Sequence, residues 1–278
     1  MPNLIRDMMK FDVKAINFCM KLSRYKNAIK YRSSDIYKEM RSLPHEGVGK
    51  DLFIILNGPS LKNQDLTLLK GKNLMFVNRG FMHPLYKELQ PKYHVFVDDK
   101  LVNGVWDIKW VDQIFEMCPN IKMIFPILWY FHPTFEKYKD DKRIFWQSWT
   151  LPFYINGVSN NCFSFAIEQE FSNIFFTGFD GNGFAYDMVK ASGQSHFYGA
   201  DPELLDMTSK QHVQAMFTTF LQIEDLRGTS CYCRKHGINI YNLTEGGICD
   251  MFIRRDFKDP YNKETEIPIK PELMYSYL

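Results

Sequence analysis

Long apolar runs are missing from this chain of 278 residues. No stretch approaches the roughly 18 apolar residues that a membrane-spanning helix requires. The first residues also lack an apolar core followed by a small-residue cleavage site, so no signal peptide is expected. The net charge of +2 is too small to favour nucleic-acid binding. These absences predict a cytoplasmic globular protein that does not bind nucleic acid.

Cysteine is scarce, with six residues scattered along the chain. Cys231 and Cys233 are separated by a single residue, one fewer than in the usual metal or redox pair, and no second pair completes a zinc site. Reduced structural thiols are therefore expected. Hydrophobic residues make up 45% of the chain, which is ample for the core of one large α/β domain.

The N-terminal segment is basic and has a helical pattern. Residues 1–32 contain eight Lys and Arg against Asp7 and Asp12, a surplus of six positive charges. Such a segment can lie on an anionic membrane surface, here the inner face of the cytoplasmic membrane. A solvated helix packed on the domain is the interpretation that we favour. A linker is predicted at residues 43–49 because Pro and Gly cluster there.

Short apolar runs alternate with helical segments from residue 50 onward. The runs predict strands at residues 51–57, 73–78, 93–98, 122–126, 143–146, 172–180 and 238–242. Helices are expected at 161–170 and 208–236, the second ending at Gly237. This order predicts a doubly wound, mostly parallel, Rossmann-like sheet in a domain of residues 50–256. Residues 1–49 would form a helical extension, and 257–278 an irregular tail that packs only locally.

Five of these predicted strands end in polar residues: Asn57, Asn78, Asp98 with Asp99, Asp180 and Asn242. Each is weak alone, because Asn and Asp are common in turns. In open α/β sheets, however, ligands bind beyond the carboxyl ends of the strands. We therefore expect a polar pocket at that edge.

Two glycine-containing turns precede predicted helices. In the first, Gly58 would let the backbone approach a phosphate, Pro59 suits the first helical turn, and Ser60 and free amides would donate to an anion. A plain strand-to-helix turn is the alternative. In the second, residues 156–161, Ser159 or Asn160 would be an ordinary N-cap, or the turn would supply further donors to the same phosphates.

The run Ile55–Lys62 resembles the N-terminal nucleotide-binding motif of bacterial sialyltransferases of glycosyltransferase family 42. Later segments resemble that family in the same order: residues 155–158, 174–180, 184–187 and 195–199. The resemblance covers about residues 50–245 and implies a sialyltransferase-like variant of the GT-A fold. A related pattern occurs in proteins of surface-polysaccharide gene clusters and in the group that includes hydroxymethylpterin pyrophosphokinase.

The resemblance implies roles for individual residues. The bend Asn57, Gly58, Pro59 and Ser60 would hold the phosphate and ribose of the donor, and Asn78 its nucleotide or sugar. Asn156 and Gly157 would face the phosphate, Gly178 and Asp180 the nucleoside, and Tyr186 the leaving phosphate. The general base of the family falls at Ala200, which cannot take a proton. His196 is then the nearest substitute and Asp201 the second candidate.

A metal-independent glycosyltransferase is the expected function. Asp98 and Asp99 are adjacent and point to opposite faces of a strand, unlike the spaced carboxylates of metal-dependent enzymes. The expected substrates are a nucleotide-linked sugar, with a CMP-linked acid sugar such as sialic acid favoured, and a glycan or lipid-linked glycan; no cofactor is required. Assembly into a homo-oligomer is left open.

Two other functions are consistent with the same residues. A pyrophosphokinase acting on a small alcohol would need Mg²⁺ on a triphosphate, with Asp98, Asp99 and Asp180 as ligands. A non-catalytic nucleotide- or glycan-binding module would explain the loss of the base at Ala200.

Overall fold

Eight parallel strands form one sheet in the order β5-β4-β3-β2-β1-β6-β7-β8. The computed structural model describes residues 15, 18, 19, 22, 25–149, 157–181, 195–202 and 207–270. The strands are β1 (Asp51–Ile55), β2 (Leu74–Val77), β3 (Tyr93–Val95), β4 (Lys122–Pro126), β5 (Ile144–Gln147), β6 (Asn173–Thr177), β7 (Asn239–Asn242) and β8 (Ile253–Arg254). The predicted doubly wound α/β fold is confirmed.

The strand order places a switch point at the centre of the sheet. The chain moves outward from β1 to β5 and then returns to β6 on the other side of β1. Strands buried on both faces read as continuous apolar runs, and the middle strands are almost wholly buried. In such sheets the crevice where the order reverses is the usual ligand site.

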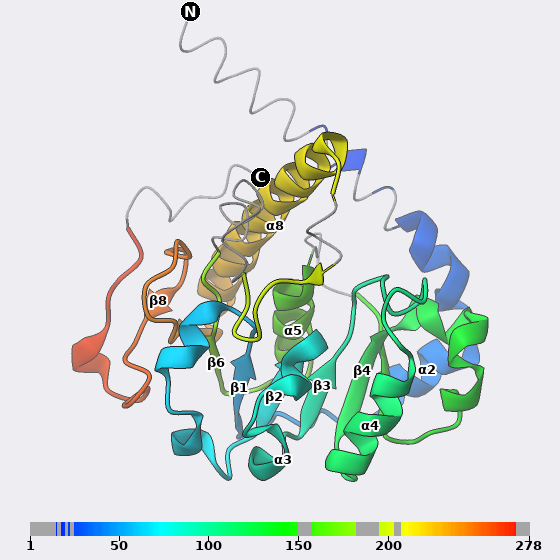
Figure 1. Ribbon diagram of the computed structural model, residues 1–278, viewed down its shortest axis with the longest axis horizontal. Coiled ribbons are helices and arrows are strands. Elements are labelled where there is room, and N and C mark those ends of the chain that lie inside the picture. Colours follow the sequence, from blue (N-terminus) through cyan, green and yellow to red (C-terminus); the bar gives the residue numbers. More distant parts are fainter. Residues whose placement is uncertain are drawn as a thin grey trace, which may run out of the picture.

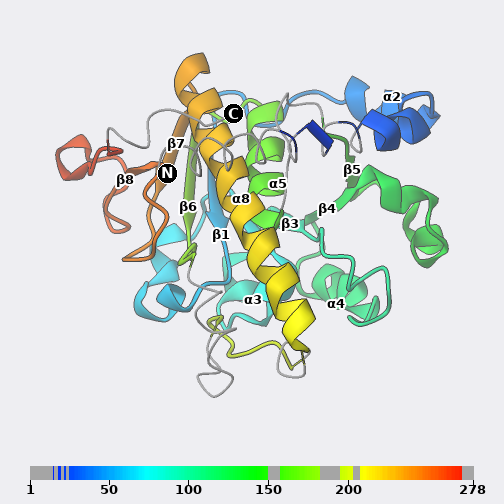
Figure 2. The same cartoon turned by 90° about the horizontal axis from the view of Figure 1, so that it is seen from above.

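Helices cover both faces of the sheet. Figure 2 shows α2 (Asp35–Ser42), α5 (Gly157–Glu168) and α8 (Ser209–His236) on one face and α3 (Tyr86–Leu89) and α4 (Lys109–Met117) on the other. Short 3-10 helices complete the described connections: η1 (Pro59–Asn63), η2 (Leu66–Leu69), η3 (Asn78–Met82), η4 (Ile127–Phe131), η5 (Pro133–Tyr138) and η6 (Lys263–Thr265). No helix among the described residues is long and apolar enough to cross a membrane.

The sequence predicts the start of α8 closely but not the start of α5. α8 begins after Thr208, which forms a capping box with Gln211, and Gly237 ends it with a φ of 65°. α5 begins four residues before the predicted start. Ser159 and Asn160 lie inside its first turn, so the N-cap prediction is wrong. Asn160 is fully buried against α8 and accepts a hydrogen bond from Thr229 (3.1 Å).

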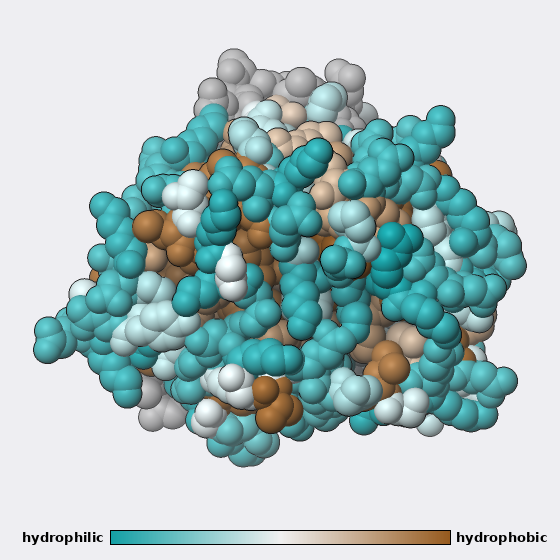
Figure 3. All heavy atoms as spheres, turned by 90° about the horizontal axis from the view of Figure 1, so that it is seen from below, coloured by the Kyte–Doolittle hydropathy of each residue, from teal (hydrophilic) through white to brown (hydrophobic). Residues whose placement is uncertain are grey.

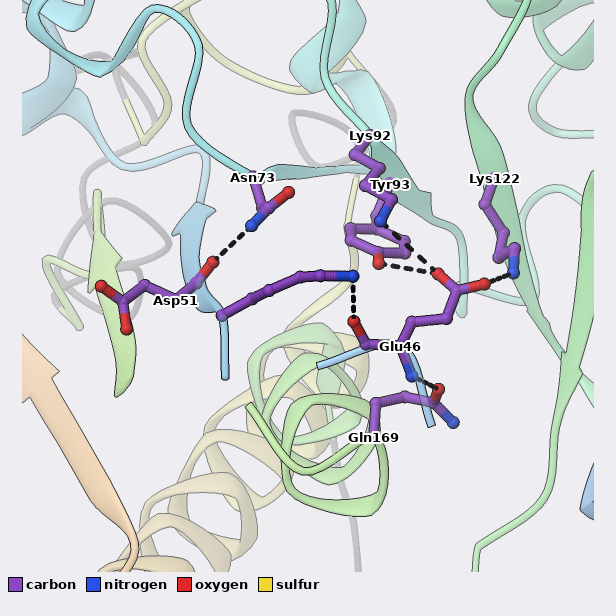
Figure 4. Close-up of polar contacts among 8 residues, drawn as sticks. Glu46, Asp51, Asn73, Lys92, Tyr93, Lys122 and Gln169 are labelled. Atoms are coloured by element: carbon purple, nitrogen blue, oxygen red, sulfur yellow. Dashed lines mark hydrogen bonds and ion pairs between the residues drawn. The ribbon is translucent and has the colours of Figure 1, made fainter. Parts of the chain in front are cut away.

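The predicted linker is a packed part of the domain. A Cβ on Gly47 would lie 2.5 Å from the carbonyl oxygen of Gln169, so this segment is in close contact with the end of α5. The carboxylate of Glu46 accepts from Tyr93 Oη (2.8 Å) and pairs with Lys122 at the amino edge of the sheet (Figure 4). Preceding residues are buried too, Tyr31 among them. Glu46 and Gly47 therefore attach the segment 43–49 to the domain, while Leu43 and Val48 are exposed.

The tail is also tied to the domain. Tyr261 Oη donates to Asp51 Oδ2 at 2.7 Å, which joins the tail to the first strand. Arg255 Nε donates to Glu266 at 2.9 Å, and Phe257 is buried. For residues 257–270, the expectation that the tail packs only locally is wrong. β8 was missed because two residues are too few for a periodic pattern.

Candidate functional site

A cavity of about 870 Å³ opens at the carboxyl edge of the sheet. Its walls come from the ends of β1, β2, β3, β4 and β6, the first turn of α5, the loop at residues 195–201, and one face of α8. The volume is typical of sites for nucleotide-sized ligands. The cavity includes the switch point between β1 and β6.

Most of the predicted site residues line this cavity: Asn57, Gly58, Asn78, Asp98, Asp99, Gly157, Gly178, Asp180, His196 and Asp201. Pro59 and Ser60 are not among the lining residues. Asn156 and Tyr186 lie outside the described residues. Asn242 faces away, because its side chain bonds the carbonyl of Cys249 and the amide of Thr244, both at 2.9 Å. Four of the five polar strand ends therefore converge.

The bend after β1 does not offer free amides to a ligand. The amide of Gly58 donates to the carbonyl of Gly178 (2.8 Å), Pro59 has no N–H, and the amide of Leu61 donates to Gly58 (3.2 Å). The amide and hydroxyl of Ser60 both donate to Asp180 Oδ2, at 3.3 and 2.9 Å. The expected anion cradle at this bend is therefore wrong: Asp180 already takes the place of the anion.

Close packing explains the two glycines beside this bend. A Cβ on Gly58 would lie 1.8 Å from Asp180 Oδ2 and 2.4 Å from the carbonyl oxygen of Gly178. Gly178 has a φ of 71° and no room for a Cβ beside the Leu56 carbonyl. Burial raises the pKa of Asp180, and the hydrogen bonds from Ser60 act in the opposite direction. The bend thus positions Asp180 at the switch point.

Two asparagines that line the cavity each have a buried side-chain oxygen without a donor. Asn57 Nδ2 donates to the carbonyl of Val77 (3.1 Å), which fixes the orientation of the amide. Neither Asn57 Oδ1 nor Asn78 Oδ1 has a hydrogen-bond partner among the described residues. A buried acceptor without a donor is unfavourable, so a ligand hydroxyl or amine that reached either oxygen would stabilise it.

A buried histidine fixes the backbone of Asn78, which has a φ of 47°. His94 Nε2 lies 2.9 Å from the Asn78 carbonyl oxygen, and Nδ1 lies 2.8 Å from Tyr86 Oη. A carbonyl can only accept, so Nε2 carries the proton and Nδ1 accepts from the tyrosine. Burial lowers the pKa of His94 to about 3, so the ring is neutral. It has a positioning role.

His196 belongs to a chain of charged groups. Its Nε2 lies 3.3 Å from Asp201 Oδ2, and the other carboxylate oxygen of Asp201 pairs with Arg79. Burial acts to raise the pKa of Asp201, but the hydrogen bond from His196 and the nearby cations lower it to about 2. Asp201 is therefore an anion at neutral pH. Its predicted role as a general base is wrong, because it lacks the raised pKa that this role requires.

The same contacts define the tautomer of His196. An anionic carboxylate only accepts, so Nε2 carries the proton and Nδ1 is left as the acceptor. Nδ1 has no hydrogen-bond partner among the described residues. The loop is held in place because the amide of Phe197 donates to the carbonyl of Asn57 (2.9 Å) and His196 stacks on Tyr198. This arrangement can accept a proton from a ligand hydroxyl.

The described walls of the cavity carry more negative than positive groups. Asp98 and Asp201 already face cations, the first with Lys100 Nζ at 3.8 Å from Oδ2. Asp99 and Asp180 add further negative charge. The first turn of α5, which lines the cavity from Gly157 to Ser159, is the favourable place for an anion, because the first N–H groups of a helix lack acceptors within it.

Three contributions to the site were missed from the sequence. Arg79 pairs with Asp201 and lies over the rings of Trp106 and Trp110. Nothing in the sequence around Arg79 indicates these distant partners. The indole of Trp149 is half-buried at the cavity and donates to Asn161 Oδ1 (2.7 Å). One face of α8 also lines the cavity. Apart from Ile223, its residues there are small or polar and carry no sequence signal.

Comparison of the chain with protein-family models finds no matching family, and comparisons with curated proteins and with solved structures find no match.

Proposed function

We propose that this protein is a glycosyltransferase that moves a sugar from a nucleotide-linked donor to a glycan hydroxyl. The observation that carries the proposal is the oriented His196 in a cavity of nucleotide size at the switch point of a doubly wound sheet. The sequence resemblance favours a CMP-linked acid sugar as the donor and surface polysaccharide as the product.

The donor would lie along the carboxyl edge of the sheet. The leaving phosphate would face the first turn of α5, where helix N–H groups stabilise negative charge. Asn57 Oδ1, Asn78 Oδ1 and Asp180 would accept hydrogen bonds from the hydroxyl or amine groups of the nucleoside and sugar. Trp149 offers a flat apolar surface for a ring of either substrate.

The acceptor would be activated by His196. As the acceptor oxygen attacks the anomeric carbon, its proton passes to Nδ1 of the imidazole. The bond between the anomeric carbon and the phosphate oxygen breaks, and its electron pair leaves with the phosphate. Arg79 holds the Asp201 carboxylate in place, and Asp201 orients the ring and stabilises the imidazolium that forms, as a carboxylate does for the histidine of a catalytic triad.

Metal dependence is left to experiment. No group of three His, Cys, Asp or Glu residues in the described part of the chain is arranged to hold a metal ion, and this includes Asp98, Asp99 and Asp180. We propose metal-independent transfer, and turnover in the presence of EDTA tests it. The pyrophosphokinase alternative predicts complete loss of turnover under that condition.

The test of the base is a pH–rate profile with CMP-sialic acid as donor. His196→Ala should lower kcat by about 10²–10⁴ and remove the acidic limb of the profile. His45→Ala, which removes an exposed histidine outside the cavity, is the control and should keep the profile unchanged. If the folded His196→Ala protein retains full turnover, this histidine is not the base. If the parent protein turns over no nucleotide-linked sugar, the non-catalytic alternative is favoured.

A further inference from the structure

An exposed apolar stripe runs along the amino-terminal half of α8. Val213, Met216, Phe217 and Phe220 are between 38% and 66% exposed. They recur at helical spacing, so they share one face. The opposite face of the same turns, with Thr219 and Gln222, lines the cavity. This part of α8 therefore has the cavity on one side and an uncovered apolar surface on the other.

A second exposed stripe lies on the N-terminal segment. Phe18, Leu22, Tyr25 and Ile29 are between 53% and 62% exposed. Ala28 and Tyr31 are buried in the core, so the segment is already attached to the domain through its other side. The outward stripe is not needed for that packing.

Both stripes lie at the mouth of the cavity. Asn27 lines the cavity from the N-terminal segment, and α8 lines it from the other side. In Figure 1 the described N-terminal residues and the first turns of α8 both lie above the carboxyl edge of the sheet, and Figure 2 shows them apart from each other when seen from above. The face at the opposite edge of the sheet is mainly hydrophilic (Figure 3). The two stripes thus flank the cavity from two sides, and we call the surface that carries them the mouth face.

The charges of both segments have one sign. Between Val13 and Ser34 the sequence has no Asp or Glu and six basic residues, Lys14, Lys21, Arg24, Lys26, Lys30 and Arg32. Between Met207 and Ile223 it has no Asp or Glu and one basic residue, Lys210. Basic residues beside an outward apolar stripe are the pattern of helices that lie in the interface of an anionic bilayer.

We infer that the mouth face docks on an anionic lipid bilayer, with the opening of the cavity directed at the membrane surface. Apolar side chains would enter the headgroup region while the basic residues meet anionic lipids. A second copy of this chain is a less favourable partner for the mouth face than a bilayer. A two-fold interface would place the same basic segment of each copy against the other, and like charges repel. The inference is independent of the donor chemistry and of His196.

The test is flotation of the full chain with vesicles of phosphatidylcholine alone or mixed with phosphatidylglycerol. We expect binding only to the mixed vesicles, weakened by added salt. Phe217→Ser should reduce partitioning about tenfold or more, and Lys26→Glu and Lys30→Glu at least about fivefold each. Val213→Ser should also weaken binding. Its matched control is Val48→Ser, equally exposed in the turn at Gly47 near the amino edge, which should have no effect.

Several results would overturn the inference. Absence of binding to mixed vesicles at low salt is one, and equal loss in Val48→Ser and Val213→Ser is another. Sedimentation of the same variants tests the alternative: an oligomer that dissociates in Phe217→Ser would assign the mouth face to a second copy. Circular dichroism of each variant must match the parent, so that unfolding is not taken for loss of docking.

Discussion

The carboxylate of Asp201 pairs with His196 and Arg79. Because of these contacts, its negative charge contributes to the free energy of unfolding. Its pKa of about 2 lies below the value of about 3.9 expected for the unfolded chain. A depressed pKa stabilises the fold above the unfolded value, and that stabilisation is lost as the pH falls from about 4 towards 2. Asp201 thus links the contacts of the His196 imidazole to overall stability.

Replacing this carboxylate should have a pH-dependent effect. Asp201→Asn should lower the free energy of unfolding by about 2 kcal/mol at pH 7, because the anion between His196 and Arg79 is removed. The difference from the parent should shrink as the pH falls through the window from about 4 to 2. Urea denaturation across this range measures it. A difference that does not change with pH would show that the charge of Asp201 is not responsible.

Residue-level prediction failed where the partner is distant in the chain. The Gly-Pro-Ser bend has the composition of a phosphate loop, yet the amide and hydroxyl of Ser60 donate to Asp180, 120 positions further on, and the amide of Gly58 donates to the carbonyl of Gly178. The same holds for Asp201, whose partner Arg79 is 122 positions away. Local sequence identifies which residues reach the edge of the sheet, but not which of them already bind one another.

Elements with strong local signals were predicted closely. α8 has a capping residue at Thr208 and a terminating glycine at Gly237, and its bounds differ from the prediction by one residue at the start. The buried parallel strands were found from their continuous apolar runs. The start of α5 and the two-residue strand β8 were not, since tertiary contacts rather than local pattern define them.

The amino edge of the sheet provides an element-level prediction. Glu46 pairs with Lys122 and accepts from Tyr93 where β3 and β4 begin (Figure 4). Burial raises the pKa of Glu46, but the contacts with Lys122 and Tyr93 outweigh this and lower it. Glu46→Gln should destabilise the fold by about 1–2 kcal/mol at neutral pH, with the loss diminishing below pH of about 4.

Thermal unfolding at several pH values checks this prediction. Glu39→Gln, an exposed position on α2, is the control and should change the midpoint little. Turnover should stay the same in Glu46→Gln, because Glu46 lies at the amino edge and the cavity at the carboxyl edge. A large loss of turnover with an intact fold would contradict this separation.

At the scale of the whole molecule, the two edges of the sheet differ in their contacts. Ion pairs and buried contacts close the amino edge, while the carboxyl edge keeps unpartnered acceptor oxygens, an oriented imidazole and a cavity of about 870 Å³. Sequence patterns were sufficient to predict the polar lining of the carboxyl edge, because four of the predicted strands end there in Asn or Asp. They did not predict the part of α8 that forms one wall.

Calorimetric titration with CMP, UDP, GDP and ATP in the presence of EDTA tests whether the cavity takes a nucleotide. We expect one of them, CMP by preference, to bind without metal. Thr219→Trp, on the cavity side of α8, should weaken that binding more than tenfold, whereas Met216→Trp on the outer side should leave it unchanged. Absence of binding by every nucleotide, binding of ATP only with Mg²⁺, or equal effects of the two tryptophan variants would contradict the proposed donor site.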